Sequence, residues 1–538
     1  MAPNLNLYSA RVVGLIDVGT NSARLMVVRL NPNMSYTIIN QHKVMVRLGE
    51  GEFLKGRLQP EAIDRTVLVL KRFVEMARNL GAEDFWAVAT SATRDAENRQ
   101  VFLERVREEA GLDLKVISGL EEARLIYLGV SSGFHLGDKT ALFIDIGGGS
   151  TETILGNQFE FFSLDSMKLG AIRLKNMFLG EDTGEVSAER YSILRQHVRN
   201  SALRTIQRVK KEEIHLTFGS SGTIENLYDI AQKNFPGKKK DPQPDTEAMT
   251  IKEVEHTIQM MCSMSLSERT RIPGMNPERA DIIIPGAAIL HTLMEEIGIG
   301  EIHVSRRSLR NGLLQDYLLR GKFGYLEKEA QLSVREQSVL QLGRSCGFNE
   351  THARHISELA LDIFDSAGEC GMHLLSGTMR ELLKYAALLH DVGMFLSFSN
   401  HHAHTYYIIR NAELLGFNNS EIALMASTAF YHSKKYPRKK HPEFASLDSD
   451  SQKAVRVLSM FLSIAESLDR THHQLVKGAY FTMDQGIPLL VIKAVEGSEI
   501  ELWALEAHQK HFNKIFGKNF NTRVEFVCEQ KNLDLEAG

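Results

Sequence analysis

The feature that most constrains the fold is a pattern of apolar runs and glycine turns that occurs twice. Residues 12–48 contain an apolar strand, a tight Asp-x-Gly loop and two further strands, in the order VVGLI, DVGTNS, ARLMVVRL and YTIINQHKVMVRL. The pattern restarts near residue 140 with TALFI, DIGGGST, ETILG and FEFFSLD, and helical patterns follow each copy. Because a sheet buries its apolar face under helices, the sequence predicts two related α/β lobes, residues 1–131 and residues 132–321.

The part of the chain beyond residue 321 has a different character. A protein of 538 residues is too long for one hydrophobic core, so further domains are expected. Residues 322–474 are almost wholly helical in pattern and rich in histidine, which predicts an all-α domain. Residues 475–538 return to strands (AYFTM, LLVIKAV, EIELWAL, RVEFVCE) with one amphipathic helix, which predicts a small α+β domain.

Composition limits the classes of ligand and the expected location. The formal net charge of -4 gives no general attraction for polyanions, so a polyanionic substrate needs locally gathered basic residues, and we expect no nucleic-acid partner. The cysteines (Cys262, Cys346, Cys370 and Cys528) form no CxxC pair, which indicates neither a disulfide framework nor a zinc ribbon. The sequence has neither a signal-peptide pattern nor an apolar run of ~18 residues, so we expect a cytoplasmic protein without membrane contact.

The first Asp-x-Gly loop, Asp17 to Ser22, leaves a strand that is predicted to be buried. Gly19 lets the backbone approach a ligand, and Thr20, Asn21 and Ser22 offer donors suited to phosphate oxygens. Asp17 at the strand end is suited to hold a hydrated Mg²⁺. A DxG sequence is also typical of a plain turn, so this loop alone does not decide between the two interpretations.

The second loop, Asp145 to Glu152, carries a stronger signal. Gly147, Gly148 and Gly149 follow an apolar strand, and their cost in conformational entropy is not needed for a plain hairpin. Consecutive backbone N–H groups suit a phosphate cradle. Asp145 and Glu152 flank this cradle as carboxylates for metal-bound or attacking water. A purely structural turn is the alternative.

A third loop, Gly219 to Thr223, follows the strand IHLTF and precedes a helix that begins near Ile224. Free N–H groups and the dipole at a helix N-terminus favour anions, so Ser221 and Gly222 are candidate phosphate-binding residues. No stretch matches GxxxxGK[ST], and a P-loop nucleotide site is therefore not predicted.

Two further polar segments follow strands between the first two loops. Glu121 and Glu122 begin a helix, where carboxylates favour the helix dipole. The functional interpretation makes one of them the base that takes a proton from an attacking water, with a pKa raised by crowding against Glu152. Arg94 also follows a strand and is suited either to clamp a phosphate with its planar fork or to form a surface ion pair.

Together these residues resemble the exopolyphosphatase/guanosine pentaphosphate phosphatase family, a branch of the acetate kinase–sugar kinase–heat-shock–actin superfamily. The matching stretches occur in the family's order over about residues 12–320: DVGTNSARL, ATSATRDAEN, ISGLEEARLIYLGV, FIDIGGGSTE, TFGSSGTIENL, IPGAAIL and SLRNGLL. The resemblance implies that Glu122 is the catalytic base and that Asp145, Gly147 and Glu152 form the metal and nucleophile-water site. It places phosphate-binding residues at Thr20, Asn21, Ser22, Arg94, Gly148, Ser150 and Ser221.

The resemblance also implies an architecture and partners. Two ribonuclease-H-like lobes are expected, followed by a helical domain derived from the HD fold and by the small tail. A homodimer is implied, in which polyphosphate passes through a basic channel between the subunits. A cation-rich loop is a candidate lining for this channel, and such a run is also typical of a solvated surface. Its residues are Lys434, Lys435, Arg438, Lys439 and Lys440.

The helical domain carries the full ligand order of an HD phosphohydrolase, whereas longer relatives often have degraded HD residues. The order H…HD…D is formed by His355, His390, Asp391 and Asp469. His404 and His432 occupy the approximate places of extra ligands in two-metal HD enzymes. Imidazole and carboxylate ligands suit Mn, Fe, Ni or Zn better than Mg. The alternative is a relic of the fold, whose histidines satisfy core hydrogen bonds.

The resulting hypothesis is in-line attack by a water, deprotonated by Glu122, on the terminal phosphorus of inorganic polyphosphate with the help of Mg²⁺. Conversion of guanosine pentaphosphate to the tetraphosphate uses the same chemistry, and no residue separates the two substrates. A sugar or acetate kinase on this scaffold would need an acceptor pocket, which the sequence does not reveal. A non-catalytic sensor of alarmone or polyphosphate would not need the acidic residues at positions 122, 145 and 152.

Overall fold

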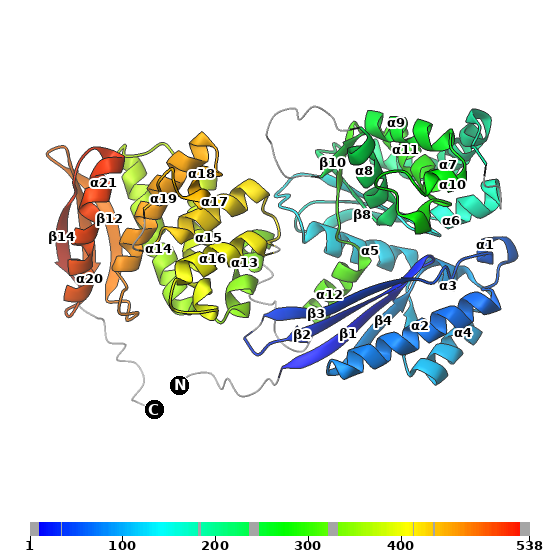
Figure 1. Cartoon of the computed structure of the whole chain (residues 1–538), viewed down its shortest axis with the longest axis horizontal. Helices are drawn as coiled ribbons and strands as arrows, with labels where there is room; N and C mark the ends of the chain where they lie inside the picture. Colours follow the sequence, from blue (N-terminus) through cyan, green and yellow to red (C-terminus); the bar gives the residue numbers. More distant parts are fainter. Residues whose placement is uncertain are drawn as a thin grey trace. The chain divides into compact units, whose positions relative to one another are not determined.

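The computed structural model describes residues 10–33, 35–180, 184–235, 247–320, 332–412, 414–433 and 436–527. The chain divides into two compact units, Met1–Val334 and Arg335–Gly538, and Figure 1 draws the first in blue to green and the second in yellow-green to red. Each unit has its own hydrophobic core.

The first sheet of unit 1 consists of β1 (Arg11–Val18), β2 (Ser22–Leu30), β3 (Tyr36–Met45), β4 (Ala82–Ala89) and β5 (Leu114–Val116), in the order β3-β2-β1-β4-β5. β1 pairs antiparallel with β2 and parallel with β4. Helices cover both faces, because α2 (Pro60–Asn79) and α4 (Arg99–Arg105) lie on one side and α12 (Leu309–Arg320) lies on the other (Figure 1). The apolar residues of β1 and β2 are therefore almost all buried.

The second sheet consists of β6 (Ala141–Ile146), β7 (Thr151–Gly156), β8 (Phe161–Met167), β9 (Leu216–Ser220), β10 (Ala248–Thr250) and β11 (Glu301–Val304), in the order β10-β11-β9-β6-β7-β8. β6 pairs antiparallel with β7 and parallel with β9, as β1 does with β2 and β4. The duplication that the sequence predicts is therefore present in the strand topology. Helices α7 (Ala188–Val209) and α11 (Ile283–Ile297) cover one face, and α5 (Gly119–Ser131) covers the other with α12.

The remaining elements of unit 1 are helices and helical turns that connect or flank the two sheets. They are α1 (Glu52–Lys55), α3 (Ser91–Asp95), the π-helical turns η1 (Val106–Ala110) and η2 (Lys175–Leu179), α6 (Ala171–Leu174), α8 (Gly222–Asn234), α9 (Ile251–Cys262), α10 (Leu266–Arg269) and the 3-10 turn η3 (Pro277–Arg279).

Unit 2 begins as a bundle of helices and ends in a small sheet. Its helices are α13 (Val334–Ser345), α14 (Glu350–Glu369), α15 (Gly377–Leu389), η4 (Val392–Phe395), α16 (His401–Asn411), α17 (Asn419–Phe430), α18 (Pro442–Ala445) and α19 (Ser449–Ser467). The sheet has the order β12-β13-β14, with β12 (Val476–Asp484), β13 (Ile487–Ala494) and β14 (Asn521–Phe526), and it is accompanied by α20 (Glu499–Ala504), η5 (Leu505–His508) and α21 (Gln509–Phe516). One core runs through helices and sheet, from Val339 to Phe520.

The predicted fold class is confirmed: two α/β lobes precede a helical region and a small α+β tail. The domain limits at residues 131, 321 and 474 stay a prediction. Within the described ranges, none of the helices combines the length and the apolar character that a membrane crossing requires.

Candidate active site

Two glycine loops face each other in unit 1, one from each sheet. The loop between β1 and β2 closes with a bond from Gly19 N–H to the Ser22 carbonyl (3.0 Å), and the loop between β6 and β7 closes in the same way from Gly147 to Ser150 (2.9 Å). A Cβ added to Gly148 would lie 2.9 Å from the Cβ of Thr20. Glycine is therefore required here by the close approach of the two loops.

A cleft opens between these loops. It brings together most of the residues that the sequence predicts for phosphate and metal: Asp17, Thr20, Asn21, Ser22, Glu122, Asp145, Gly147, Gly148, Ser150, Ser221 and Gly222. Two predicted residues are not in its lining. Glu152 is buried on β7, opposite Asp145 in the ladder, and its Oε1 accepts a bond from Ser166 Oγ at 2.8 Å. Arg94 lines a neighbouring depression with Asp95 and Lys168.

The third glycine loop closes another side of the cleft. Ser221 has a left-handed backbone (φ 90°), which non-glycine residues seldom adopt, and its Oγ donates to the Ile146 carbonyl at 2.8 Å. Ser220 Oγ donates to Asp145 Oδ2 at 2.5 Å. Helix α8 begins at Gly222, so its first N–H groups, which have no partner inside the helix, are directed to the cleft.

The neighbouring glutamates on α5 have different surroundings. Ser118 caps the helix by accepting from the N–H of Glu121, and the Glu121 carboxylate forms an ion pair with Arg124 at 2.7 Å. Glu122 is buried and lines the cleft. Its Oε2 accepts a bond from Arg94 Nη1 at 3.0 Å. Arg94 therefore holds the candidate base in place. The sequence did not predict this contact between Arg94 and Glu122.

The pKa of Glu122 is raised to about 7. Burial is the largest cause, because it disfavours the charged carboxylate; Arg94 opposes this rise, and the carboxylates of Asp145 and Asp17 add to it. The sequence predicted crowding by Glu152 as the cause. In the structure Glu122 in turn raises the pKa of Glu152, for which burial is again the largest cause.

The remaining carboxylates fit a hard divalent cation. Burial raises the pKa of both Asp17 and Asp145. Asp17 Oδ2 and Glu152 Oε2 are buried and find no hydrogen-bond partner in the described part of the chain. Anionic oxygens that lack a donor are the ligands that Mg²⁺ takes in proteins. Asp17, Asp145 and Glu152 are not among the groups of described residues whose ligand atoms all lie within 4.8 Å of one another, so they suit a hydrated Mg²⁺ that keeps several of its waters rather than an ion held directly by all three.

Two arginines of the cleft were missed by the sequence analysis. Arg24 on β2 and Arg279 in η3 both line the cleft, and neither forms an ion pair with any described residue. Arg24 donates to Ser308 Oγ at 3.0 Å, and burial followed by the charge of Arg24 lowers the pKa of Arg279 to about 10. Gly222 makes room for Arg279, since a Cβ there would lie 2.2 Å from Nη2. Arg279 is buried and Arg24 is half-buried. Guanidinium groups that lie in a cleft without a carboxylate partner indicate an anionic ligand.

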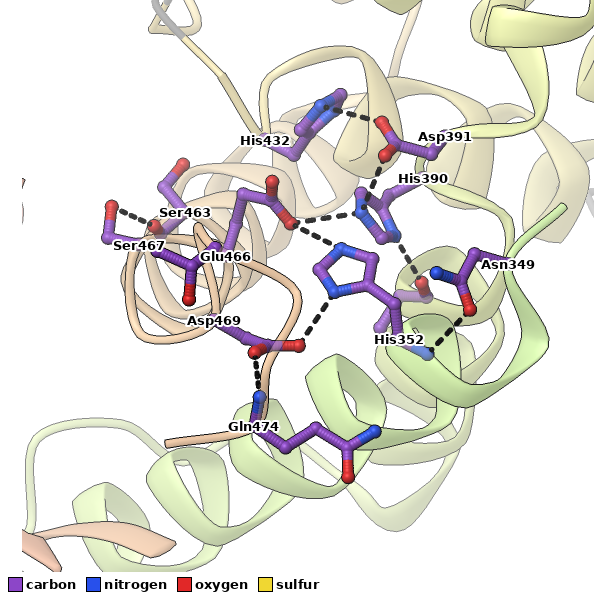
Figure 2. Close-up of polar contacts among 12 residues, drawn as sticks. Asn349, His352, His390, Asp391, His432, Ser463, Glu466, Ser467, Asp469 and Gln474 are labelled. Carbon is purple, nitrogen blue, oxygen red and sulfur yellow. Dashed lines mark hydrogen bonds and ion pairs between the residues drawn. The ribbon is translucent and has the colours of Figure 1, made fainter. Parts of the chain in front are cut away.

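A second cluster of polar residues lies in unit 2 (Figure 2). It contains the predicted His390, Asp391 and His432, but other predicted ligands are replaced by neighbours in sequence. The cluster has His352 in place of His355, Glu466 in place of Asp469 and His401 in place of His404.

The physical reason is helix geometry. His355 is close to one turn beyond His352 on α14, which brings it beside the backbone of Val476. Asp469 lies past the end of α19, and its Oδ2 contacts His352 Nδ1 at 2.8 Å. Asp469 therefore contacts a member of the group and does not belong to the group itself.

The candidate channel residues lie between α17 and α18. Arg438, Lys439 and Lys440 are exposed. Lys434 and Lys435 lie outside the described residues. The channel stays a prediction.

Comparison with known proteins gives a consistent result. The model of the Ppx/GppA phosphatase family matches residues 26–321, and the model of Ppx/GppA phosphatase domain III matches residues 334–513. The crystal structure of an exopolyphosphatase from Cytophaga hutchinsonii is 27% identical and has a TM-score of 0.53; the match covers 58% of this chain and 100% of that one. An exopolyphosphatase-like protein is 25% identical with a TM-score of 0.52, over 58% of this chain and 98% of that one.

Proposed function

Since the chain belongs to the Ppx/GppA phosphatase family, a family of phosphoanhydride hydrolases, we propose that it is an exopolyphosphatase that releases terminal orthophosphate from inorganic polyphosphate. The observation that carries the proposal is the presence of Arg24 and Arg279, which form no ion pair with any residue that the structure describes, in a cleft that also holds the buried Glu122. A cleft with a base on one side and free guanidinium groups on another is suited to hydrolyse a polyanion.

The first chemical step is the activation of water. Glu122 is held in place by Arg94 at 3.0 Å, and its raised pKa of about 7 matches that of an efficient general base near neutral pH. The carboxylate takes a proton from the water as the water oxygen forms its bond to the terminal phosphorus. The bond from that phosphorus to the bridging oxygen breaks, and the bridging oxygen stays with the shortened chain.

The second requirement is the stabilisation of charge on the phosphoryl oxygens. Arg24, Arg279, the hydroxyls of the first loop and the N–H groups of the glycine loops offer donors around the cleft. Donors fixed before the reaction stabilise the transition state without reorganisation. Asp17, Asp145 and Glu152 would hold a Mg²⁺ ion, which when bound neutralises part of the phosphate charge.

Further features of the proposal rest on family membership. They are a homodimer, a cytoplasmic location and a basic channel that includes Arg438, Lys439 and Lys440. Guanosine pentaphosphate is the competing substrate, because removal of its terminal phosphate requires the same groups.

The test is phosphate release by the purified full chain with Mg²⁺, comparing long polyphosphate, short polyphosphate and guanosine pentaphosphate. We expect the highest kcat/KM for polyphosphate. A preference for guanosine pentaphosphate would replace the proposed substrate. Tight binding without turnover of any of the three would contradict the enzymatic proposal and favour a sensor.

A further inference from the structure

Two groups of side chains in unit 2 share one aspartate. The first group is His352, His390, Asp391 and Glu466, and the second is Asp391, His401 and His432. They come from α14, the end of α15, α16, the end of α17 and α19, so distant parts of the chain converge. Figure 2 shows His352, His390, Asp391, His432 and Glu466 of these groups. His352, His390 and His432 are at most 3% exposed.

The hydrogen bonds of the imidazoles fix their tautomers. Each Nδ1 contacts an oxygen that can only accept a hydrogen bond, either an ionised carboxylate or a backbone carbonyl. The partners are Asp469 Oδ2 for His352 (2.8 Å), the Ala387 carbonyl for His390 (2.7 Å), the Phe398 carbonyl for His401 (3.1 Å) and the Ala429 carbonyl for His432 (2.5 Å). Each Nδ1 must therefore carry the hydrogen, and each neutral ring presents a lone pair at Nε2.

These lone pairs face other acceptors. His390 Nε2 lies 2.9 Å from the Glu466 carboxylate, and His352 Nε2 lies 3.4 Å from it. The Nε2 atoms of His401 and His432 face each other at 3.1 Å, and each lies 3.6 Å from Asp391 Oδ1. Without positive charge between them, these contacts would be repulsive.

Protons alone are a poor solution for this arrangement. The Nε2 atoms of His352 and His390, with Asp391 Oδ1 and Glu466 Oε2, are buried and find no hydrogen-bond donor among the residues that the structure describes. Protonating several adjacent buried imidazoles would place like charges side by side, which is unfavourable. A divalent cation satisfies several of these lone pairs at once.

The spacing fits metal coordination. With metal–nitrogen distances of about 2.0–2.1 Å, neighbouring ligand atoms are separated by about 3.0 Å in octahedral and about 3.4 Å in tetrahedral geometry. The ligand contacts given above range from 2.9 to 3.6 Å.

We propose that unit 2 contains a dinuclear transition-metal centre bridged by Asp391. His352, His390, Glu466 and Asp391 bind one ion; His401, His432 and Asp391 bind the other. The carboxylate is placed to bridge, since Oδ2 lies 3.5 Å from His390 Nε2 and Oδ1 faces His401 and His432.

The donor set defines the class of metal. Imidazole nitrogen with carboxylate oxygen suits Mn, Fe, Co, Ni or Zn rather than Mg or Ca. The contacts at Nδ1 orient the rings, as the groups behind metal ligands generally do. The side chains of Asp391 and His401 are 15% and 17% exposed, so the second ion, with three protein ligands, keeps a position open to water.

The experiment is metal analysis of the purified full chain after loading with Mn²⁺, Co²⁺ or Zn²⁺ and desalting. Asp391→Ala should lose two ions per chain relative to wild type, and this difference counts only the ions of this centre, whatever unit 1 retains. His401→Ala should lose one ion. The matched controls are His404→Ala on the same helix and His355→Ala on α14, which should lose none.

A difference of one ion or none between wild type and Asp391→Ala would overturn the dinuclear assignment. Loss of metal from the His355 or His404 variants, with retention in Asp391→Ala, would overturn the ligand set. Asp391→Asn, checked for fold by circular dichroism, replaces Asp391→Ala if the latter is unfolded.

Two further measurements distinguish a bound centre from loosely held metal. Added metal should raise the melting temperature of wild type, because it binds the native state, and should not raise that of Asp391→Asn. The Mn²⁺-loaded wild type should give the spin-coupled EPR spectrum of a bridged pair, and His401→Ala should give that of an isolated ion. Asp469→Asn should weaken metal affinity by about 10–100-fold. An isolated-ion spectrum in wild type would contradict the bridge.

Discussion

The two clusters of buried polar groups differ in which atoms lack a partner. In the cleft of unit 1, both hydrogen-bond acceptors and hydrogen-bond donors lack a partner within the described ranges. Asp17 Oδ2 lacks a donor, whereas Arg24 Nε and Asn21 Nδ2 lack acceptors. In the cluster of unit 2 the leftover atoms of His352, His390, Asp391 and Glu466 are all electron-pair donors. The first pattern calls for a ligand with both charges, such as a phosphate with its cation, and the second calls for cations alone.

The largest expected effect is the loss of activity in Glu122→Gln, a change that affects the cleft of unit 1 and leaves the cluster of unit 2 intact. Glu122→Gln keeps the shape of the side chain but cannot take the proton, so kcat should fall by roughly 10²–10⁴-fold. Substrate affinity and the transition-metal content of unit 2 should change little. Phosphate-release kinetics and metal analysis on the same preparation measure both.

Glu121→Gln is the matched control for this prediction, because Glu121 pairs with Arg124 away from the cleft. A loss of less than about tenfold in Glu122→Gln would mean that another carboxylate, Glu121 or Glu152, is the base.

The unpaired arginines provide the next test. Arg279→Ala should lower kcat/KM by about 10²–10³-fold, the usual effect of losing one fixed donor to the transition state. The melting temperature should not fall, because a buried guanidinium without a partner does not stabilise the fold. The exposed Arg271→Ala is the control. Destabilisation with unchanged kinetics would show that Arg279 has a structural role.

The acidic limb of the pH profile sharpens the assignment of Glu122. Only the ionised carboxylate accepts a proton, and its pKa is raised to about 7. The value of kcat/KM should therefore fall about tenfold per pH unit below 7 and level off above it. The profile of Glu122→Gln is the control, since a limb that persists there belongs to the substrate's own phosphate. A limb near the ordinary pKa of glutamate would contradict the assignment.

The smallest expected effect concerns the basic loop of unit 2 and tests whether this loop contacts the substrate. Replacing Arg438, Lys439 and Lys440 by glutamine should raise KM for long polyphosphate by about tenfold or less and flatten its dependence on salt. Short polyphosphate should be nearly unaffected. The exposed Lys453→Gln serves as the control. Equal effects on long and short chains would assign the loop to ordinary surface.

Local patterns predicted the lobes and the glycine loops, because each loop directly follows an apolar strand. The sequence analysis missed Arg24, although this residue interrupts the apolar strand β2. A charged residue in a strand does not by itself show whether its side chain meets solvent, a carboxylate or a ligand. Arg279 has no local signal, and only the packing of η3 beside Gly222 brings it to the cleft. The sequence predicts His355 as a ligand and does not identify His352 for a similar reason. The two are three residues apart on α14, and only packing against α19 decides which one meets Glu466.

The contact between Thr20 and Gly148 makes the cleft sensitive to a single methyl group. Alanine at position 148 would press on Thr20 and also approach Ile172, at 3.3 Å. The added methyl group would push the two loops apart and widen the cleft, although alanine neither binds the substrate nor takes part in the reaction. A substitution that changes no charge, donor or acceptor would thus change the width of the opening.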